Sequence, residues 1–334
     1  MYTFRLRKSV VFKHGTMKLR NYFDNENRTL AIVTLAIFLQ SILFIIFIFT
    51  GNCLQHDDIN HREYTVVSKP ILHPISCNHV NTSQFDNVYE SEFWGPKLSK
   101  PEGFYGNAHF PPPSRSSSSG GGSDLGPRTI NSLDILRRTI KRFNISTMID
   151  IPCGDVNWIF DSWETDSLEL YIGLDVVKPV IDLNSKRFAH HNNKVFAQWD
   201  GSYCNLPKFL KPSMNLHNLP DRTRPILQSV DLIHSRDVLQ HLTLKAGLSF
   251  LCNMVTSGAR ILISTTFPEG SNTDIQPGQF YHNNLDLPPF SLPDKKIECV
   301  STHPQLESDQ TCVYDLSGDW IKSWVQEKCH DTLL

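Results

Sequence analysis

The sequence lacks an excess of charge of either sign. Its 334 residues include 32 lysines and arginines against 34 aspartates and glutamates, which gives a formal net charge of −2. A protein that binds nucleic acid usually presents a basic surface, so this balance predicts no nucleic-acid partner. No internal repeat stands out, and the length allows one good-sized domain beside shorter segments.

Closely spaced cysteine pairs are also missing. None of the eight cysteines belongs to a C-x-x-C pair, the spacing with which short motifs place two thiolates on one zinc ion. The sequence therefore predicts no metal site.

Glycine is scarce where a nucleotide-binding protein would need it. Residues 147–155 read Thr-Met-Ile-Asp-Ile-Pro-Cys-Gly-Asp, an apolar, β-branched run that leads into a tight turn. A pyrophosphate-binding turn has the pattern G-x-G-x-x-G, whereas this turn has Gly154 alone, between Asp150 and Asp155. An acidic turn with one glycine fits a ligand that has a cationic end and no phosphate.

The segments on either side of this turn predict helices. Residues 158–160 (Trp-Ile-Phe) form an apolar group suited to the start of a helix, and we expect Trp158, Phe160 and Met148 to lie in the core. Residues 129–143 show helical spacing before the first strand. Their expected buried face consists of Ile130, Leu133, Leu136 and Ile140.

Four further apolar runs predict strands separated by helices. Nearly continuous apolar runs are typical of parallel strands that are covered on both faces. Three of the runs lead into Asp175, Asp200 and Asp237. Open α/β sheets bind ligands at the carboxyl ends of their strands, so these carboxylates mark the candidate site. The predicted strands span 168–174, 195–199, 230–234 and 259–266.

The ordered set of motifs resembles the class I S-adenosylmethionine-dependent methyltransferases, and looks closest to a subgroup whose first motif reads DIPCGD. The similarity covers about residues 84–320. It implies a Rossmann-like class I methyltransferase fold, an α/β architecture with a mostly parallel seven-stranded sheet and helices on both faces. The segments that carry it are 85–95 (FDNVYESEFWG), 120–123, 150–155 (DIPCGD), 236–241 (RDVLQH), 265–269 (TTFPE) and 284–293 (NLDLPPFSLP).

The first motif departs from the D-x-G-x-G that is common in this family. Pro152 replaces the first glycine, and Val156 stands where a third glycine often lies. The resemblance also implies that the glycine-serine end of the low-complexity segment 111–126 folds over the cofactor.

The resemblance assigns S-adenosylmethionine to the acidic strand ends. Asp150 and Gly154 would hold its methionine end, Asp175 its ribose hydroxyls, and Asp200 would meet the adenine. Asp237 and His241 are the candidate catalytic residues, with Asp237 either taking a proton from a hydroxyl acceptor or orienting His241. Asn284, Pro288 and Phe290 would line the acceptor side. The full predicted cofactor set is Asp150, Pro152, Cys153, Gly154, Asp155, Asp175, Val176, Asp200, Gly201 and Arg236.

Some of these residues also have a structural interpretation. Asp175 can be an ordinary loop carboxylate, and Asp200-Gly201 a plain turn. Asp237 can be a helix N-cap. His241 would then be a structural residue on the same helical face, four positions later.

The amino-terminal region predicts a membrane anchor. Residues 30–50 are apolar and uncharged, which is enough to cross a bilayer as a helix. Basic residues precede them and acidic residues follow, so the chain is predicted to be a single-pass type II protein with a cytosolic amino terminus. A cleaved signal peptide is the rival interpretation. The predicted parts are a cytosolic tail (1–29), the signal anchor (30–50), a lumenal stem (51–83) and a methyltransferase domain (84–334) with a flexible insertion at 96–126.

A lumenal domain would fold in an oxidising environment, where cysteines can pair. Cys299 and Cys312 flank a predicted terminal strand pair and are the best disulfide candidate, with two free buried thiols as the alternative. Cys153 and Cys252 are expected to be unpaired. Glycosylation sequons lie at Asn81 and Asn144.

This topology, a short tail with an anchor and a stem, resembles that of Golgi glycan-modifying enzymes. It predicts O-methylation of a glycan hydroxyl in the Golgi or endoplasmic reticulum. Three alternatives stay open: a lipid or protein acceptor, a non-catalytic binding module, and a glycosyltransferase. The last is disfavoured because the sequence has no Asp-x-Asp, the usual motif of metal-dependent enzymes of that class.

Overall fold

The residues described in the computed structural model lie in the carboxyl-terminal part of the chain, from residue 70 onward. All described residues fall in the compact unit Val66–Leu334. The predicted tail, the anchor at 30–50, Asn81 and most of the stem lie outside them. Among the described residues, no helix is long and apolar enough to span a membrane. The described residues are 70–74, 76–77, 80, 85–87, 117, 119, 123, 127–210, 227–276, 279–303 and 306–330.

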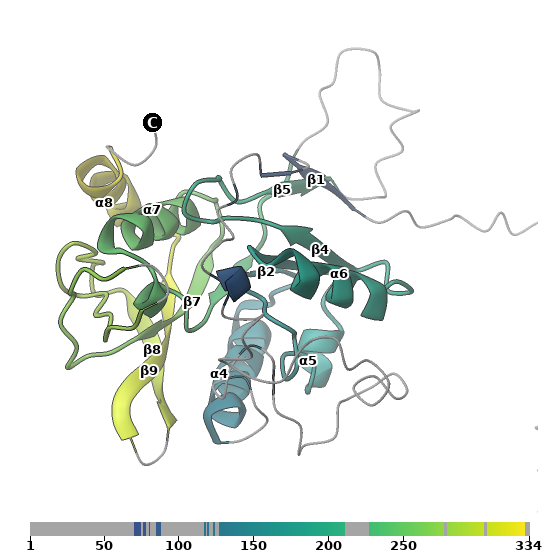
Figure 1. Cartoon of the computed structure of the whole chain (residues 1–334), viewed down its shortest axis with the longest axis horizontal. Helices are drawn as coiled ribbons and strands as arrows, with labels where there is room; N and C mark the ends of the chain where they lie inside the picture. Colours follow the sequence, from purple (N-terminus) through teal and green to yellow (C-terminus); the bar gives the residue numbers. More distant parts are fainter. Residues whose placement is uncertain are drawn as a thin grey trace, which may run out of the picture. The chain divides into compact units, whose positions relative to one another are not determined.

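A seven-stranded sheet forms the centre of this unit (Figure 1), with strand order β4-β3-β2-β6-β7-β9-β8. The first five strands in this order are parallel, and β9 and β8 are antiparallel additions at one edge. The predicted mostly parallel, seven-stranded sheet is therefore confirmed. The strands are β2 (Thr147–Asp150), β3 (Leu170–Asp175), β4 (Lys194–Gln198), β6 (Leu232–Ser235), β7 (Ile261–Thr266), β8 (Lys296–His303) and β9 (Leu306–Asp315).

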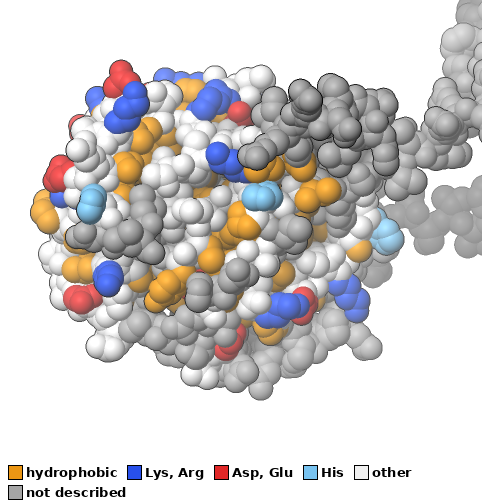
Figure 2. Space-filling view, turned by 90° about the horizontal axis from the view of Figure 1, so that it is seen from above, with side chains coloured by type: hydrophobic (Ala, Val, Ile, Leu, Met, Phe, Trp, Pro, Cys, Tyr) orange, Lys and Arg blue, Asp and Glu red, His pale blue; other side chains and the backbone are white. Residues whose placement is uncertain are grey.

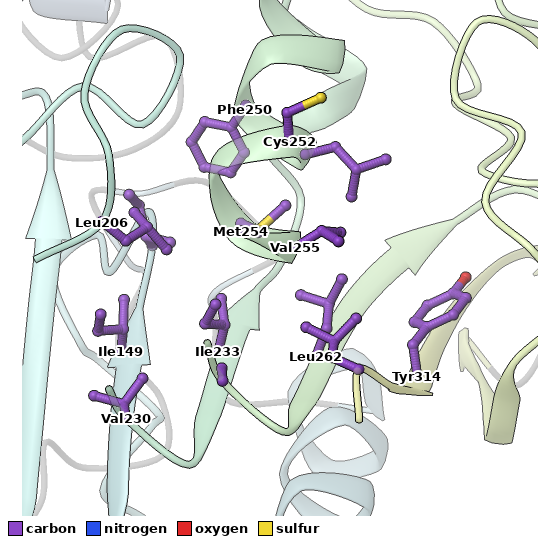
Figure 3. Close-up of a cluster of buried hydrophobic side chains, with 14 of the residues drawn as sticks. Ile149, Leu206, Val230, Ile233, Phe250, Cys252, Met254, Val255, Leu262 and Tyr314 are labelled. Carbon is purple, nitrogen blue, oxygen red and sulfur yellow. The ribbon is translucent and has the colours of Figure 1, made fainter. Parts of the chain in front are cut away.

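Helices cover both faces of the sheet, as predicted. Figure 3 shows α7 lying over one face, with Phe250 and Met254 above Ile149 and Ile233. The other face packs on α4 and α6. A separate pair of short strands, β1 (Ile71–His73) and β5 (Lys208–Leu210), is antiparallel. The helices are α4 (Pro127–Phe143), α5 (Trp163–Asp166), α6 (Lys178–Arg187), the 3₁₀ helix η3 (Leu239–His241), α7 (Leu244–Val255) and α8 (Trp320–Lys328).

The buried face of α4 differs from the predicted one at its start. Ile130 is 59% exposed, although Leu136 and Ile140 are buried as expected. The first turns face the sheet with small polar residues instead, and Ser132 hydrogen-bonds to Thr311 of β9. Hydrophobicity alone misplaced the face because these hydroxyls have partners on the neighbouring strand.

The prediction of a helix beginning at residues 158–160 was wrong, although Met148, Trp158 and Phe160 are buried as expected. Successive turns follow β2, and α5 begins only after Ser162, whose hydroxyl caps it by accepting from the Thr165 N–H. The Asp161 N–H donates to the Trp158 carbonyl, three residues earlier, as in a turn and not as in an α-helix, and Val156 just before has a φ of 48°. The Asp155 carboxylate accepts the Asn157 N–H and stabilises the turn instead of a helix.

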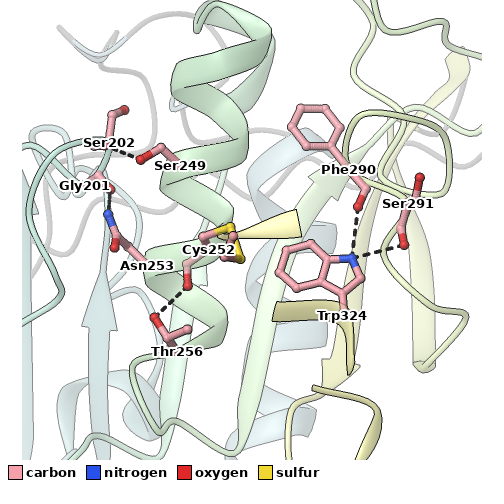
Figure 4. Close-up of a disulfide and its surroundings, with 10 residues drawn as sticks. Gly201, Ser202, Ser249, Cys252, Asn253, Thr256, Phe290, Ser291 and Trp324 are labelled. Carbon is pink, nitrogen blue, oxygen red and sulfur yellow. Dashed lines mark hydrogen bonds between the residues drawn. A yellow bond between two sulfur atoms is a disulfide. The ribbon is translucent and has the colours of Figure 1, made fainter. Parts of the chain in front are cut away.

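Three disulfides join distant parts of the described chain. Cys299–Cys312 is confirmed and links directly opposed residues of β8 and β9. The prediction that Cys252 is unpaired was wrong, because Cys252 forms a disulfide with Cys329 at the end of α8 (Figure 4). Cys77–Cys204 was not predicted. Cys153 is a buried free thiol, as expected.

Charged groups of both signs are mixed on the face shown in Figure 2, where hydrophobic side chains occupy much of the middle and most charged ones lie toward the rim.

Candidate functional site

The candidate site begins where β2 and β3 end side by side. Asp175, the last residue of β3, points its carboxylate at the turn that follows β2: it accepts the Gly154 N–H at 3.0 Å and the Val177 N–H at 2.9 Å. Burial raises the pKa of Asp175 to about 6; hydrogen bonds from the backbone N–H groups of Val177 and Gly154 oppose this, and the nearby charge of Asp150 adds to it. Residues that are 21 positions apart therefore meet at one point.

Asp150, the last residue of β2, directly precedes this turn. Its carboxylate accepts a hydrogen bond from the Tyr171 hydroxyl at 2.5 Å and another from Nδ1 of His234 at 2.7 Å. All three side chains are buried. Asp150 thus ties together β2, β3 and β6, and both of its oxygens already have a protein donor.

The turn after β2 requires glycine at position 154. Gly154 has a φ of +53°, and a Cβ placed there would lie 2.5 Å from the Ser119 hydroxyl. Both conditions require glycine. Pro152 is partly exposed beside it, and the Cys153 N–H donates to the Leu174 carbonyl.

Two serines of the low-complexity segment cover this turn. The Ser117 hydroxyl donates to the buried carboxylate of Asp155 at 2.9 Å, and the Ser119 hydroxyl accepts the Asp155 N–H at 2.9 Å. Asp155 thus holds these two serines against the turn, while the folding of the segment's glycine-serine end over a cofactor stays a prediction.

The end of β4 closes the second side of the site. The Trp199 N–H donates to the Asp175 carbonyl, and Gln198 donates to the carbonyl of Val176. The Asp200 carboxylate accepts the Ser202 N–H at 2.9 Å. This hydrogen bond stabilises a turn, as expected if Asp200-Gly201 has a structural role. A Cβ on Gly201 would lie 2.4 Å from the Phe250 ring, so packing explains this glycine.

The end of β6 supplies a charged pair. Arg236 lies over the Trp158 ring, with Nη2 3.2 Å from Oδ2 of Asp237. Asp237 has a φ of 54° and precedes η3, whose N-cap residue is Val238. The N-cap interpretation of Asp237 is therefore wrong, and so is the expectation that it shares a helical face with His241. The Asp237 N–H instead donates to Thr265 of β7.

The two catalytic candidates differ in proton affinity. Burial alone would raise the pKa of Asp237, but the charge of Arg236 and hydrogen bonds from Gln240 and Thr265 outweigh it and lower that pKa. Burial lowers the pKa of His241, against opposing effects from the Gln279 carbonyl and Asp237. Asp237 is thus a stable carboxylate, and His241 is mostly a neutral imidazole near neutral pH.

Neutral His241 has a defined tautomer. Its Nδ1 lies 3.0 Å from the Gln279 carbonyl, which only accepts, so Nδ1 carries the hydrogen and the lone pair is on Nε2. Of the two candidates, His241 is the better proton acceptor.

The predicted acceptor loop is mainly structural. Phe290 is fully buried, and its carbonyl accepts from the Trp324 indole N–H (Figure 4). The Asn284 amide donates to the carbonyls of Pro268 and Gly270. Of the three predicted residues, only Pro288 is exposed. The prediction that Phe290 and Asn284 line the acceptor side was therefore wrong. Both residues are buried, and the Phe290 carbonyl and the Asn284 amide already have hydrogen-bond partners within the protein.

An aromatic residue outside the predicted acceptor set contacts His241. Phe280, 51% exposed, contacts the rings of His241, Phe267 and His282. The sequence offered one weak signal, the aromatic run 280–282 (Phe-Tyr-His). His234 and Tyr171, the partners of Asp150, gave none because they belong to ordinary buried strands.

No protein-family model and no curated protein matches the chain. Solved structures with similar architecture include the magnesium protoporphyrin IX methyltransferase of Synechocystis PCC 6803 with bound SAH, at 11% identity, covering 70% of this chain and 99% of that one, with a TM-score of 0.44. The N-methyltransferase NodS of Bradyrhizobium japonicum WM9 with S-adenosyl-l-homocysteine has 15% identity, coverage of 70% and 100%, and a TM-score of 0.43. The activity of this chain does not follow from structural similarity at these identities and TM-scores. A proposal about its function must therefore rest on the geometry of the site.

Proposed function

We propose that the chain is an S-adenosylmethionine-dependent methyltransferase. The observation that carries this proposal is the contact between the Asp175 carboxylate and the Gly154 N–H at the carboxyl ends of β3 and β2. It joins the acidic turn after β2 to a buried carboxylate. A cationic ligand with a ribose diol fits this pair, because the acidic turn attracts the cation and the carboxylate accepts from hydroxyls.

The cofactor supplies an activated methyl group, and this chain supplies binding and orientation. Gly154 lets the main chain approach the methionine end, and Asp175 holds the ribose. Ser117 and Ser119 are held against the turn by their hydrogen bonds with Asp155. Tyr171 and His234 hold Asp150 in place below it.

The acceptor is proposed to be a hydroxyl, whose proton passes to Nε2 of His241. Asp237 is ionised beside it and stabilises the imidazolium that results. This assignment follows from the tautomer that the Gln279 carbonyl imposes on His241.

The proposed location is the lumen of the Golgi or endoplasmic reticulum, in a single-pass type II protein anchored by residues 30–50. Three disulfides among the described residues support an oxidising compartment. A glycan hydroxyl is the acceptor that best suits this location.

Calorimetry and turnover on the detergent-solubilised full chain test the proposal. We expect S-adenosylmethionine to bind, and methyl label to appear in glycans released from glycoproteins. Asp175→Ala should weaken binding about tenfold or more, since hydrogen bonds to a charged group contribute roughly 1.5–3 kcal/mol. Absence of cofactor binding would reject the proposal. Binding without transfer to glycans, lipids or proteins would favour the non-catalytic alternative.

A further inference from the structure

His241 belongs to an aromatic cluster whose other members have no role in the mechanism above. The cluster consists of His241, Phe267, Phe280 and His282. Phe267 directly follows β7, and His241 ends η3 after β6. The cluster therefore lies at the carboxyl ends of β6, which neighbours β2 and its cofactor turn, and of β7, the next strand in the sheet.

Main-chain hydrogen bonds hold the segment that carries Phe280. The Gln279 carbonyl contacts His241 Nδ1, and the Tyr281 N–H donates to the Gln240 carbonyl at 3.1 Å. The Phe267 N–H donates to the Asn283 carbonyl at 2.7 Å. The segment is thus tied to both strand ends, so Phe280 has a defined place.

The rings form a small face with polar edges. Phe267 is 5% exposed and stacks on His282 with ring centroids 4.7 Å apart. Phe280 meets both rings edge-on and is 51% exposed. One apolar ring is therefore presented between two imidazoles, the second belonging to His241 at 5.7 Å.

We propose that Phe280 is the platform on which the acceptor sugar stacks, with His241 and His282 contacting its hydroxyls. A pyranose has an apolar C–H face and a rim of hydroxyls, which matches one exposed ring between two imidazoles. An acyl chain would require a larger contiguous apolar surface. This inference rests on the proposed function and specifies how its acceptor binds.

The arrangement also explains how a hydroxyl reaches the base. A sugar stacked on Phe280 carries its hydroxyls at the edge of the ring, on the side where His241 lies. Phe280 is then a positioning residue for the acceptor and leaves the cofactor contacts at Asp175 and Gly154 unaffected.

Saturation-transfer NMR and kinetics on the detergent-solubilised full chain test this platform. The probe is a pool of free oligosaccharides released from glycoproteins, studied with and without S-adenosylmethionine. The variants are Phe280→Ala, Phe280→Leu and Phe280→Tyr. Trp163→Ala is the matched control, since Trp163 is 77% exposed and its neighbour Glu164 pairs with Lys141 in the last turn of α4, away from the site.

We expect saturation of aromatic protons to reach the ring protons of the sugars in the wild type and in Trp163→Ala. Phe280→Ala and Phe280→Leu should raise the KM for the sugar roughly tenfold, as expected for loss of an aromatic contact. Their Kd for S-adenosylmethionine should not change, and Phe280→Tyr should restore the KM.

Three results would overturn the platform: an unchanged sugar KM in Phe280→Ala, wild-type behaviour in Phe280→Leu, or no saturation transfer to sugars from a wild type that binds the cofactor. Failure of the wild type to bind S-adenosylmethionine rejects the proposed function instead, and the cofactor-free NMR arm still decides whether Phe280 binds sugar.

Discussion

At the scale of single residues, the site depends on carboxylates whose surroundings give them different tasks. Asp150 accepts from Tyr171 and His234, Asp175 accepts from backbone N–H groups, and Asp237 pairs with Arg236. The sequence identified all three because each lies at or just beyond a strand end. It did not identify the partners of Asp150, since contacts between residues 21 and 84 positions apart leave no local pattern.

The raised pKa of Asp175 predicts pH-dependent cofactor binding. Ribose hydroxyls donate to the ionised carboxylate, so binding should tighten as pH rises through about 6 and weaken below it. Calorimetry between pH 5 and pH 8 measures this dependence. Asp175→Asn should bind weakly at every pH, with a flat profile; a profile that stays steep in this variant would assign the titration to another group.

The same pKa has a consequence for stability without ligand. The pKa of Asp175 in the folded state, about 6, lies above its ordinary value of 3.8, so the folded state retains a proton that the unfolded state releases between these values. The contribution of Asp175 to stability therefore falls as pH rises through this window.

His241→Gln should lower turnover about 10²-fold to 10⁴-fold while the Kd for S-adenosylmethionine stays nearly constant, because it removes a general base that does not contact the cofactor. Asp237→Asn should lower turnover by a smaller factor, since Asp237 only stabilises the imidazolium. Turnover per folded molecule on the identified acceptor measures both. If His241 is structural instead, its variant will melt at a lower temperature with normal turnover per folded molecule.

At the scale of elements, strands were predicted better than helix faces. Each of the four strands whose bounds were predicted begins and ends within about two residues of those bounds, because a strand buried on both faces is a continuous apolar run. Helix faces depended on contacts that the sequence does not display. Ser132 of α4 faces the sheet through Thr311, and the turn at Asp155 replaced a predicted helix.

Two glycines on or beside α7 predict opposite responses to alanine. Gly201→Ala places a Cβ 2.4 Å from the Phe250 ring and should destabilise the protein by about 1–3 kcal/mol through overpacking. Gly247→Ala, inside α7, meets the Phe290 ring at an ordinary 3.4 Å and should be neutral or slightly stabilising, because alanine favours helix. Chemical denaturation compares the two. Equal destabilisation would show that the contact with Phe250 is not the cause.

At the scale of the whole molecule, the disulfides connect the sheet to segments that the family resemblance did not describe. Cys77–Cys204 holds the segment that carries β1, with a sequence separation of 127. Cys252–Cys329 pins α8 to α7 across a separation of 77. Closing such long loops restricts the unfolded chain and stabilises the fold. Only the pair within one hairpin, Cys299–Cys312, was readable from local sequence.

Membrane topology gives the last prediction. Protease added to sealed microsomes should remove only the cytosolic tail at 1–29 and spare the domain, because the positive flank before residue 30 orients the anchor. Asn144, exposed at the end of α4, should carry a glycan whose mass is lost in Asn144→Gln. Detergent added with the protease is the control that exposes the domain. Digestion of the domain in intact microsomes, with no glycan on Asn144 or Asn81, would place it in the cytosol. The disulfides would then lack the oxidising compartment that the proposed function requires.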